Sequence, residues 1–251
     1  MKKTKIEIIK DVLIPIGVLV LALIVWQIAA AIAKAKTTPA ITFVAIIDVF
    51  KQAVFWRSLG ATFLRALIAF AVSFALAFVC AIIAGCNDIA LRIFSPIITA
   101  VRSAPTMAIV LLFIITVTAN VTTVLVGTLV LFPTFYAALL PVAKSVNKDL
   151  VELSLVCGAS RLQRLRYVYL PTMAPAAIEN GIAGLSLAIK LIVSAEVLAQ
   201  TARSIGMMMQ SARAYLEADR LLALTIIVVV VCIIIDGVGK SVFSAVAKKF
   251  N

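Results

Sequence analysis

Residues 144–171 read KSVNKDLVELSLVCGASRLQRLRYVYLP and separate two strongly apolar stretches of a 251-residue chain. The pattern predicts a short helix that Asp149 starts and that runs through leucines and valines to Cys157. Gly158 follows, and glycine readily adopts the positive φ that ends many helices. The first half of the segment is therefore expected to be a helix of about two turns with a glycine at its end.

The second half of the segment carries its own helix signal. Ser160 and Gln163 have the S-x-x-Q spacing of a capping box, in which each side chain bonds to the backbone of the other residue. A second helix is thus expected after Ser160, and Pro171 is expected to stop it before the next apolar stretch. Apolar and charged residues fall on separate faces of this pair. Such faces suit either a lipid surface or a protein partner, and the residues alone leave both interpretations open.

Outward from this segment the chain is apolar. Of all residues 64% are hydrophobic and 14% are charged, against about 25% charged residues in a soluble domain. The fold class expected is therefore an all-α, polytopic membrane helical bundle, a single domain over 1–251 with its core at 57–245. A helix needs about 20 apolar residues to cross a bilayer. We expect six spans, or five if the third and fourth merge, at 12–33, 60–84, 93–118, 121–143, 174–200 and 221–243.

Charge placement predicts the orientation of these spans. More of the 23 Lys and Arg residues lie on the side of residues 144–171 than on the other side. By the positive-inside rule that side faces the cytoplasm, together with both termini. The span 12–33 follows a basic start and ends in small residues, as a signal peptide does. Its apolar run is longer than the roughly 7–15 residues usual in such peptides, so we favour a retained span.

The composition also argues against several kinds of chemistry. The chain has no His and no CxxC pair among its four Cys residues, so neither a metal nor a cofactor is expected. The net charge of +12 comes from short segments between spans, which favours membrane orientation over nucleic-acid binding. Residues 237–241 imitate the end of a P-loop, but Ile234 occupies the position of its first glycine. We expect no catalytic residues and no ATP binding in this chain.

The segment 144–171 resembles a known pattern, the EAA loop of binding-protein-dependent ABC importer permeases. That pattern reads Glu-Ala-Ala, three residues, Gly, nine residues and then Ile-x-Leu-Pro. In this chain the corresponding positions hold Glu152, Leu153, Ser154, Gly158, Val168, Leu170 and Pro171. The spacing is kept, whereas the two alanines are replaced and Val stands for Ile.

The resemblance implies that the chain is the permease subunit of an ABC importer and not an enzyme, with ATP hydrolysis in separate subunits. The helix at 150–158 would be the coupling helix that sits in a groove of the ATPase. The implied partners are two ATP-binding subunits, a second permease subunit (most simply a homodimer), an extracytoplasmic substrate-binding protein and the lipid of the bacterial inner membrane. The implied docking residues are Glu152, Leu153, Ser154, Cys157, Gly158, Ala159, Ser160, Leu170 and Pro171.

Residues 40–240 are similar to the branch of these permeases that serves nitrate, sulfonate, taurine, bicarbonate and pyrimidine-precursor importers. The similarity rests on residues in and beside the spans, namely Arg65, Arg102, Ala195, Glu196 and Asp236. Two features depart from the branch: residues 102–105 read RSAP instead of Arg-Pro-x-Pro, and Lys190 stands where a neutral residue is expected. These departures bear on the substrate rather than on the family.

Ionisable residues inside spans are costly and for that reason are candidates for function. Lys190 and Glu196 are expected on one helix about 9 Å apart along its axis, and a direct pair is not expected. Glu196 is expected to reach water or to meet Arg65 or Arg203. Packing within the bundle and a place on the transport path both remain open. The path candidates are Arg102, Pro105, Met107, Lys190, Glu196 and Gly206, and by hypothesis Arg102 and Lys190 attract an anionic substrate.

Two other classes of membrane protein compete with this interpretation. A secondary transporter or channel-like protein would work without an ATPase, but secondary transporters typically contain internal repeats, and we find no convincing one. A membrane enzyme would need clustered catalytic groups, whereas the charges within these spans are sparse. Co-purification with an ATPase would support the ABC importer permease over both alternatives.

Overall fold

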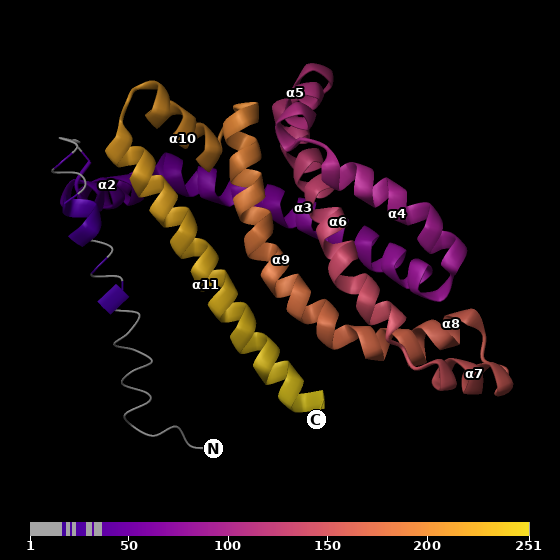
Figure 1. Ribbon diagram of the computed structural model, residues 1–251. Helices are drawn as coiled ribbons and strands as arrows, with labels where there is room; N and C mark the ends of the chain where they lie inside the picture. Colours follow the sequence, from indigo (N-terminus) through magenta and orange to yellow (C-terminus); the bar gives the residue numbers. More distant parts are fainter. Residues whose placement is uncertain (1–16, 19–20, 22–23, 29–31, 33–36, 251) are drawn as a thin grey trace, which may run out of the picture.

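The computed structural model describes residues 17–18, 21, 24–28, 32 and 37–250 (Figure 1). The expected first span, 12–33, therefore lies largely outside the described residues. From residue 37 onward the named elements are all helical, which confirms the all-α fold class. They are α2 (Pro39–Lys51), α3 (Ala53–Cys86), α4 (Asp88–Ser103), α5 (Thr106–Thr116), α6 (Ala119–Lys144), α7 (Lys148–Val156), α8 (Arg161–Arg164), the π-helical turn η1 (Leu165–Tyr169), α9 (Leu170–Ala199), α10 (Ile205–Ala214) and α11 (Ala218–Phe250).

Among the described residues, four helical stretches are long and apolar enough to cross a membrane: Ala53–Cys86, Ala119–Lys144, Arg161–Ala199 and Ala218–Ser241. These contain the expected spans 60–84 and 121–143 and nearly all of the expected spans 174–200 and 221–243. Within the expected span 93–118 the helix is broken, because α4 and α5 meet at a bend of 89°. Pro105 lacks an N–H and forces Ala104 into extended backbone, with ψ 132°, so the helix stops there. Counted as one broken span, the pair brings the total to five.

The segment before α3 also differs from expectation. A single outer helix from Phe43 to Trp56 is predicted by sequence, but Gln52 adopts extended backbone with ψ 120° and separates α2 from α3. Trp56 thus belongs to the first turns of α3, where its indole N–H donates to the Phe50 carbonyl oxygen at 3.0 Å. Thr38 caps the start of α2 by accepting from the Ile41 N–H. The break lets α2 pack against α11 before the chain enters the bundle.

The core of the bundle forms where α3, α6 and α9 pack together. From residue 62 onward, the buried residues of α3 are small and recur about once per turn: Thr62, Ala66, Ala69, Ser73, Ala77, Ala81 and Ala84. Small side chains let helices approach closely in a membrane, where hydrophobic collapse is not available. At the end of α3, a Cβ on Gly85 would lie 2.7 Å from the Ala143 Cβ of α6. Small side chains therefore bring α3 into close contact with its neighbours along most of its length.

The helix that follows the segment 144–171 is longer than predicted. Residues Arg161–Ala199 form one helical stretch, in which η1 joins α8 to α9 without a break. Pro171 therefore does not stop the second helix, and that prediction is wrong. In η1 the Leu170 N–H donates to the Leu165 carbonyl five residues back. This wider turn changes the hydrogen-bond register just before Pro171, which sits in the first turn of α9 where its missing N–H costs little.

Candidate functional site

The loop between α6 and α9 has the local structure that its sequence predicts. Asn147, rather than Asp149, caps α7, and its side-chain oxygen accepts from the Asp149 N–H at 2.8 Å. The helix ends at Val156 with Cys157 as its C-cap, and Gly158 has a φ of 71°. The Ala159 N–H donates to the Ser154 carbonyl at 2.9 Å and closes the turn. The predicted glycine-terminated helix is confirmed, with its start two residues earlier than expected.

The predicted capping box is also present. The Ser160 N–H donates to Gln163 Oε1 at 2.7 Å, and the Gln163 N–H donates to Ser160 Oγ at 3.3 Å. These two bonds satisfy N–H groups that a helix start otherwise leaves open. The turn between α7 and α8 is therefore held at both sides, by Gly158 before it and by the capping box after it.

Large apolar side chains project from this capped loop. In the described chain Leu153 is 59% exposed, Val156 86% and Leu162 73%. Figure 1 shows α7 and α8 at the end of the bundle opposite to α5 and α10. Most of the candidate docking residues lie on this exposed loop, whereas Leu170 and Pro171 lie beyond η1 in the first turn of α9. We refer to the exposed parts of α7, the turn and α8 as the docking loop.

Glu152 occupies a different position from its neighbours. It lines a cavity of about 310 Å³ whose wall also includes Asp88 at the start of α4, Lys144 at the end of α6 and Tyr169 in η1. Glu152 thus borders this cavity and is also exposed to solvent. In the part of the chain that the structure describes, Glu152 is the one docking candidate on this cavity. Glu152 thus lies beside the same cavity as the ends of α3 and α6 and the start of α4.

Two of the path candidates meet at the end of the bundle that is opposite to the docking loop (Figure 1). Glu196 of α9 is fully buried, and its Oε1 accepts from Arg65 Nη1 of α3 at 2.8 Å. Its Oε2 accepts from the Thr62 hydroxyl at 2.9 Å and from the Gly206 N–H at 3.2 Å. We call Thr62, Arg65, Glu196 and Gly206 the outer cluster. Of the two arginines that sequence offered as partners, Arg65 forms the pair, whereas Arg203 is exposed.

The outer cluster extends to a further helix through Arg65. Its Nη2 donates to Asn120 Oδ1 of α6 at 2.8 Å and to the Ala202 carbonyl at 3.3 Å. Close approach makes Gly206 necessary, because a Cβ there would lie 2.3 Å from the Glu196 Cβ. The cluster therefore ties together α3, α6, α9 and the start of α10.

The other path candidates are not part of the outer cluster. Arg102 lies in the last turn of α4, Pro105 is the N-cap residue of α5, and Met107 is 61% exposed in the first turn of α5. Lys190 is exposed on α9. Within the described residues, neither Arg102 nor Lys190 forms an ion pair. Both cations are thus available to an ion or to a partner.

One polar feature of α4 was missed by sequence reasoning. Arg92, Ser95, Thr99, Arg102 and Ser103 recur with helical spacing and are all exposed. The three hydroxyls donate to carbonyl oxygens four residues back at 2.7–2.8 Å. A polar face at membrane depth is costly against lipid, so it is expected to face water or protein. The 3.6-residue spacing of these side chains is the signal that would have revealed it.

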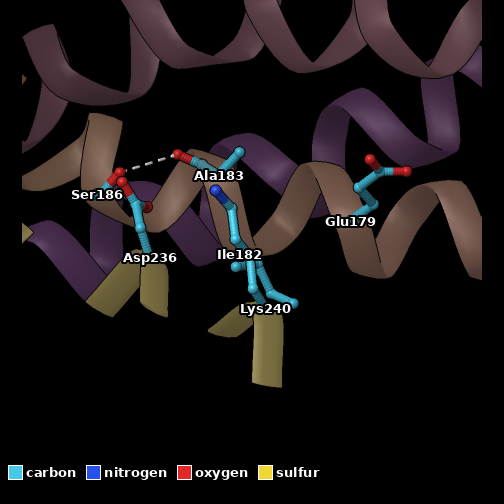
Figure 2. A pocket seen from close by; sticks show the side chains of 6 residues that line it. All are labelled: Glu179, Ile182, Ala183, Ser186, Asp236 and Lys240. Atoms are coloured by element: carbon cyan, nitrogen blue, oxygen red, sulfur yellow. Dashed lines mark hydrogen bonds between the residues drawn. The ribbon is translucent and has the colours of Figure 1, made fainter. Parts of the chain in front are cut away.

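A charged cavity of about 320 Å³ lies between α9 and α11, lined by Glu179, Ile182, Ala183, Ser186, Asp236 and Lys240. Figure 2 shows Lys240 extending from α11 toward α9, with Asp236 beside Ser186. Lys240 belongs to the stretch that imitates a P-loop. That stretch lies inside the continuous helix α11, so it does not offer the free N–H groups of a helix start.

The fold and these sites define a multi-pass helical membrane protein with a capped, apolar docking loop. Residues 74–248 match the family described as binding-protein-dependent transport system inner membrane component, and the chain belongs to this family. It is therefore the transmembrane permease subunit of an ABC importer in the inner membrane, and ATP is hydrolysed in partner ATPase subunits. Membership implies ATPase and substrate-binding protein partners, and the alternative without an ATPase is not favoured.

Individual relatives agree with this assignment. The chain is 28% identical over 188 residues to the taurine transport system permease protein TauC of Escherichia coli (strain K12), covering 74% of this chain and 68% of that protein. This similarity supports the nitrate, sulfonate and taurine branch. The fold is similar to an inward-facing MetNI methionine ABC transporter, with a TM-score of 0.61, 18% identity and coverage of 76% and 93%. It is likewise similar to an amino acid ABC transporter with histidines, with a TM-score of 0.61, 13% identity and coverage of 78% and 94%.

Proposed function

We propose that the docking loop is the surface on which the ATPase subunit binds. The observation that supports this is the exposure of Leu153 and Val156, at 59% and 86%, on a helix whose two ends are capped. An exposed apolar patch that is held rigidly is typical of a protein interaction site. Lipid would accept the same side chains, but an adaptable lipid surface does not require the glycine turn and the capping box to fix their positions.

The arrangement of the complex follows from this surface. Two copies of the chain pair as a homodimer, each with one ATP-binding subunit on its docking loop, and an extracytoplasmic binding protein delivers the solute. Both termini and the docking loop face the cytoplasm, as the distribution of Lys and Arg favours. Binding and hydrolysis of ATP move the docking loops and switch the path between outward-facing and inward-facing states.

The solute that passes is proposed to be a small anion. Arg102 and Lys190 carry positive charges that no acidic side chain neutralises within the described residues, and Arg102 lies on the polar face of α4. Pro105 and Met107 mark the break between α4 and α5, where the helix pair bends. The similarity to a taurine permease fits an anionic group on the solute, because taurine carries a sulfonate in addition to its ammonium group. Broken helices beside charged residues are common on transport paths.

Reconstitution of the complex tests these proposals in one experiment. The permease is co-expressed with the candidate ATPase, purified, and placed in liposomes with the candidate binding protein. We expect the ATPase to co-purify and ATP hydrolysis to rise when the loaded binding protein is added. Uptake of a labelled sulfonate should exceed that of a neutral amino acid of similar size. Failure of the ATPase to bind would overturn the docking proposal, whereas preference for the neutral solute would overturn only the substrate proposal.

A further inference from the structure

One helical stretch connects the docking loop to the outer side of the bundle. It runs from Arg161, directly after Ser160 of the capping box, to Ala199, and its 39 residues measure about 58 Å along the helix axis at 1.5 Å per residue. It ends at Gln200, whose left-handed backbone, with φ 48°, turns the chain toward α10. A displacement at the docking loop reaches the outer side through this one element, provided that its outer end is held by its neighbours.

The outer cluster holds that end by a buried charge. Glu196 lies in the last turn of the stretch and accepts bonds from Arg65, Thr62 and Gly206. A buried ion pair is weak support for stability, because apolar residues of similar volume often serve equally well. Its better attested use is to fix one register between elements. Here it fixes the register of α9 against α3.

The same atoms attach α10 to this assembly. The first N–H groups of α10 donate to side chains of the other helices: Ile205 N–H to Thr62 Oγ1 at 3.0 Å and Gly206 N–H to Glu196 Oε2 at 3.2 Å. Thr201, in the turn before α10, shares a hydroxyl hydrogen bond of 2.7 Å with Thr123 of α6. Because these contacts are buried and direct, α10 cannot shift independently of α9 while they persist.

We propose that Arg65 and Glu196 form a latch that makes α10 follow the long helical stretch during transport. They are positioning residues, and they act by joining the outer helix to the element that begins at the docking loop. The inference rests on the proposed docking function, since ATP-driven movement must enter at that loop. With the pair removed, the docking loop would still move with the ATPase, but α10 would respond less and ATP would be hydrolysed without import.

The test measures ATP hydrolysed per solute imported by the reconstituted complex. Arg65→Gln and Glu196→Gln remove one charge each while keeping hydrogen-bonding groups. Lys51→Gln is the matched control, because Lys51 pairs with Asp48 at 3.2 Å on the exposed surface. We expect the ratio to rise about tenfold in the two latch variants, within the usual range of coupling between sites, and to stay unchanged in the control. A proportionate loss of hydrolysis and import, with an unchanged ratio, would mean a merely structural role and would overturn the latch.

A glycine pair offers a second route if the charge variants do not assemble. Gly206→Ala places a Cβ against Glu196, whereas a Cβ at Gly60 on α3 meets nothing within 4 Å. We expect Gly206→Ala to raise the ratio and Gly60→Ala to leave it alone. An unchanged ratio in an assembled Gly206→Ala complex overturns the latch. Loss of ATPase binding in the unaltered protein would instead overturn the docking proposal, so the two failures are distinguishable.

Distance measurements read the proposed movement directly. Spin labels are placed at Tyr167→Cys in η1, near the start of the long helical stretch, and at Tyr215→Cys after α10, both exposed, with the four native cysteines replaced. In the protein with an unaltered latch, the distance between the two labels should have a single narrow distribution both without nucleotide and with ATP, whether or not its mean changes. In Thr62→Val and Arg65→Gln the distribution should broaden when ATP is added. Distributions as narrow as those of the unaltered latch would overturn the proposal.

Discussion

The ring of Phe135 on α6 lies against the backbone of Gly184 on α9. A Cβ at residue 184 would be 2.1 Å from Phe135 Cε1 and 2.3 Å from its Cζ. The ring is itself fixed, because Phe70 and Phe74 of α3 meet it edge-on at centroid distances of 5.6 and 5.2 Å. The contact between α3, α6 and α9 therefore requires that residue 184 is a glycine, which has no side chain.

Gly184→Ala is expected to destabilise the bundle by about 1–3 kcal/mol, as overpacking of a core does. Gly181→Ala, one turn earlier on the same helix, is the control, because a Cβ there meets Phe70 and Phe74 at an ordinary 3.8 Å. Both changes gain about 1 kcal/mol of helix propensity, so Gly181→Ala should be neutral or stabilising. Thermal unfolding of the purified protein in detergent, followed by circular dichroism, measures both. Equal melting temperatures for the two variants would contradict the packing argument.

Substitution of the exposed apolar side chains of the docking loop is expected to affect ATPase binding much more than folding. Leu153→Asp and Val156→Asp should each abolish co-purification of the ATPase subunit, because a charge would be buried in the interface without a partner. Neither should lower the melting temperature of the isolated permease by more than a few degrees, since both side chains are exposed in it. The measurement is the ATPase recovered with the tagged permease after mild washing.

Leu216→Asp is the control for this pair of substitutions. Leu216 is 89% exposed after α10, at the opposite end of the bundle from the docking loop. It should leave ATPase recovery unchanged. Normal recovery with Leu153→Asp and Val156→Asp would show that the ATPase binds elsewhere and that the loop rests on lipid.

The local sequence predicted the structure of the docking loop well, but it predicted poorly the contacts between residues that are far apart in the chain. The turn at Gly158 and the capping box at Ser160 depend on neighbouring residues, so their signals are present within a few positions. The π turn before Pro171 depends on the register of a helix that continues beyond it, and a proline gives no sign of that. The partner of Glu196 lies 131 residues away in sequence. The packing of α3 against α9 determines that Glu196 pairs with Arg65 and not with Arg203.

The proposed orientation predicts which cysteines a thiol reagent reaches from each side of the membrane. Cys86 and Cys157 are exposed, whereas Cys232 is buried. With the first two on the cytoplasmic side, a membrane-impermeant maleimide should not label spheroplasts until they are permeabilised. A cysteine introduced by Tyr215→Cys, at the outer end, should be labelled without permeabilisation. Labelling of Cys157 in intact spheroplasts would reverse the proposed topology.

The last prediction concerns the anionic substrate. Arg102→Gln and Lys190→Gln should each lower uptake of a sulfonate by about fivefold, the effect typical of an exposed charge pair. Arg57→Gln, which removes an exposed arginine from the outer end of α3, is the control for lost charge in general. Because exposed charges are screened over about 10 Å at 0.1 M salt, the difference should shrink as ionic strength rises. Competing anions should inhibit the unaltered protein more strongly than the variants. If both variants import the sulfonate at the control rate and are inhibited equally, these two cations do not attract the solute, and the polar face of α4 serves contact with the second copy instead.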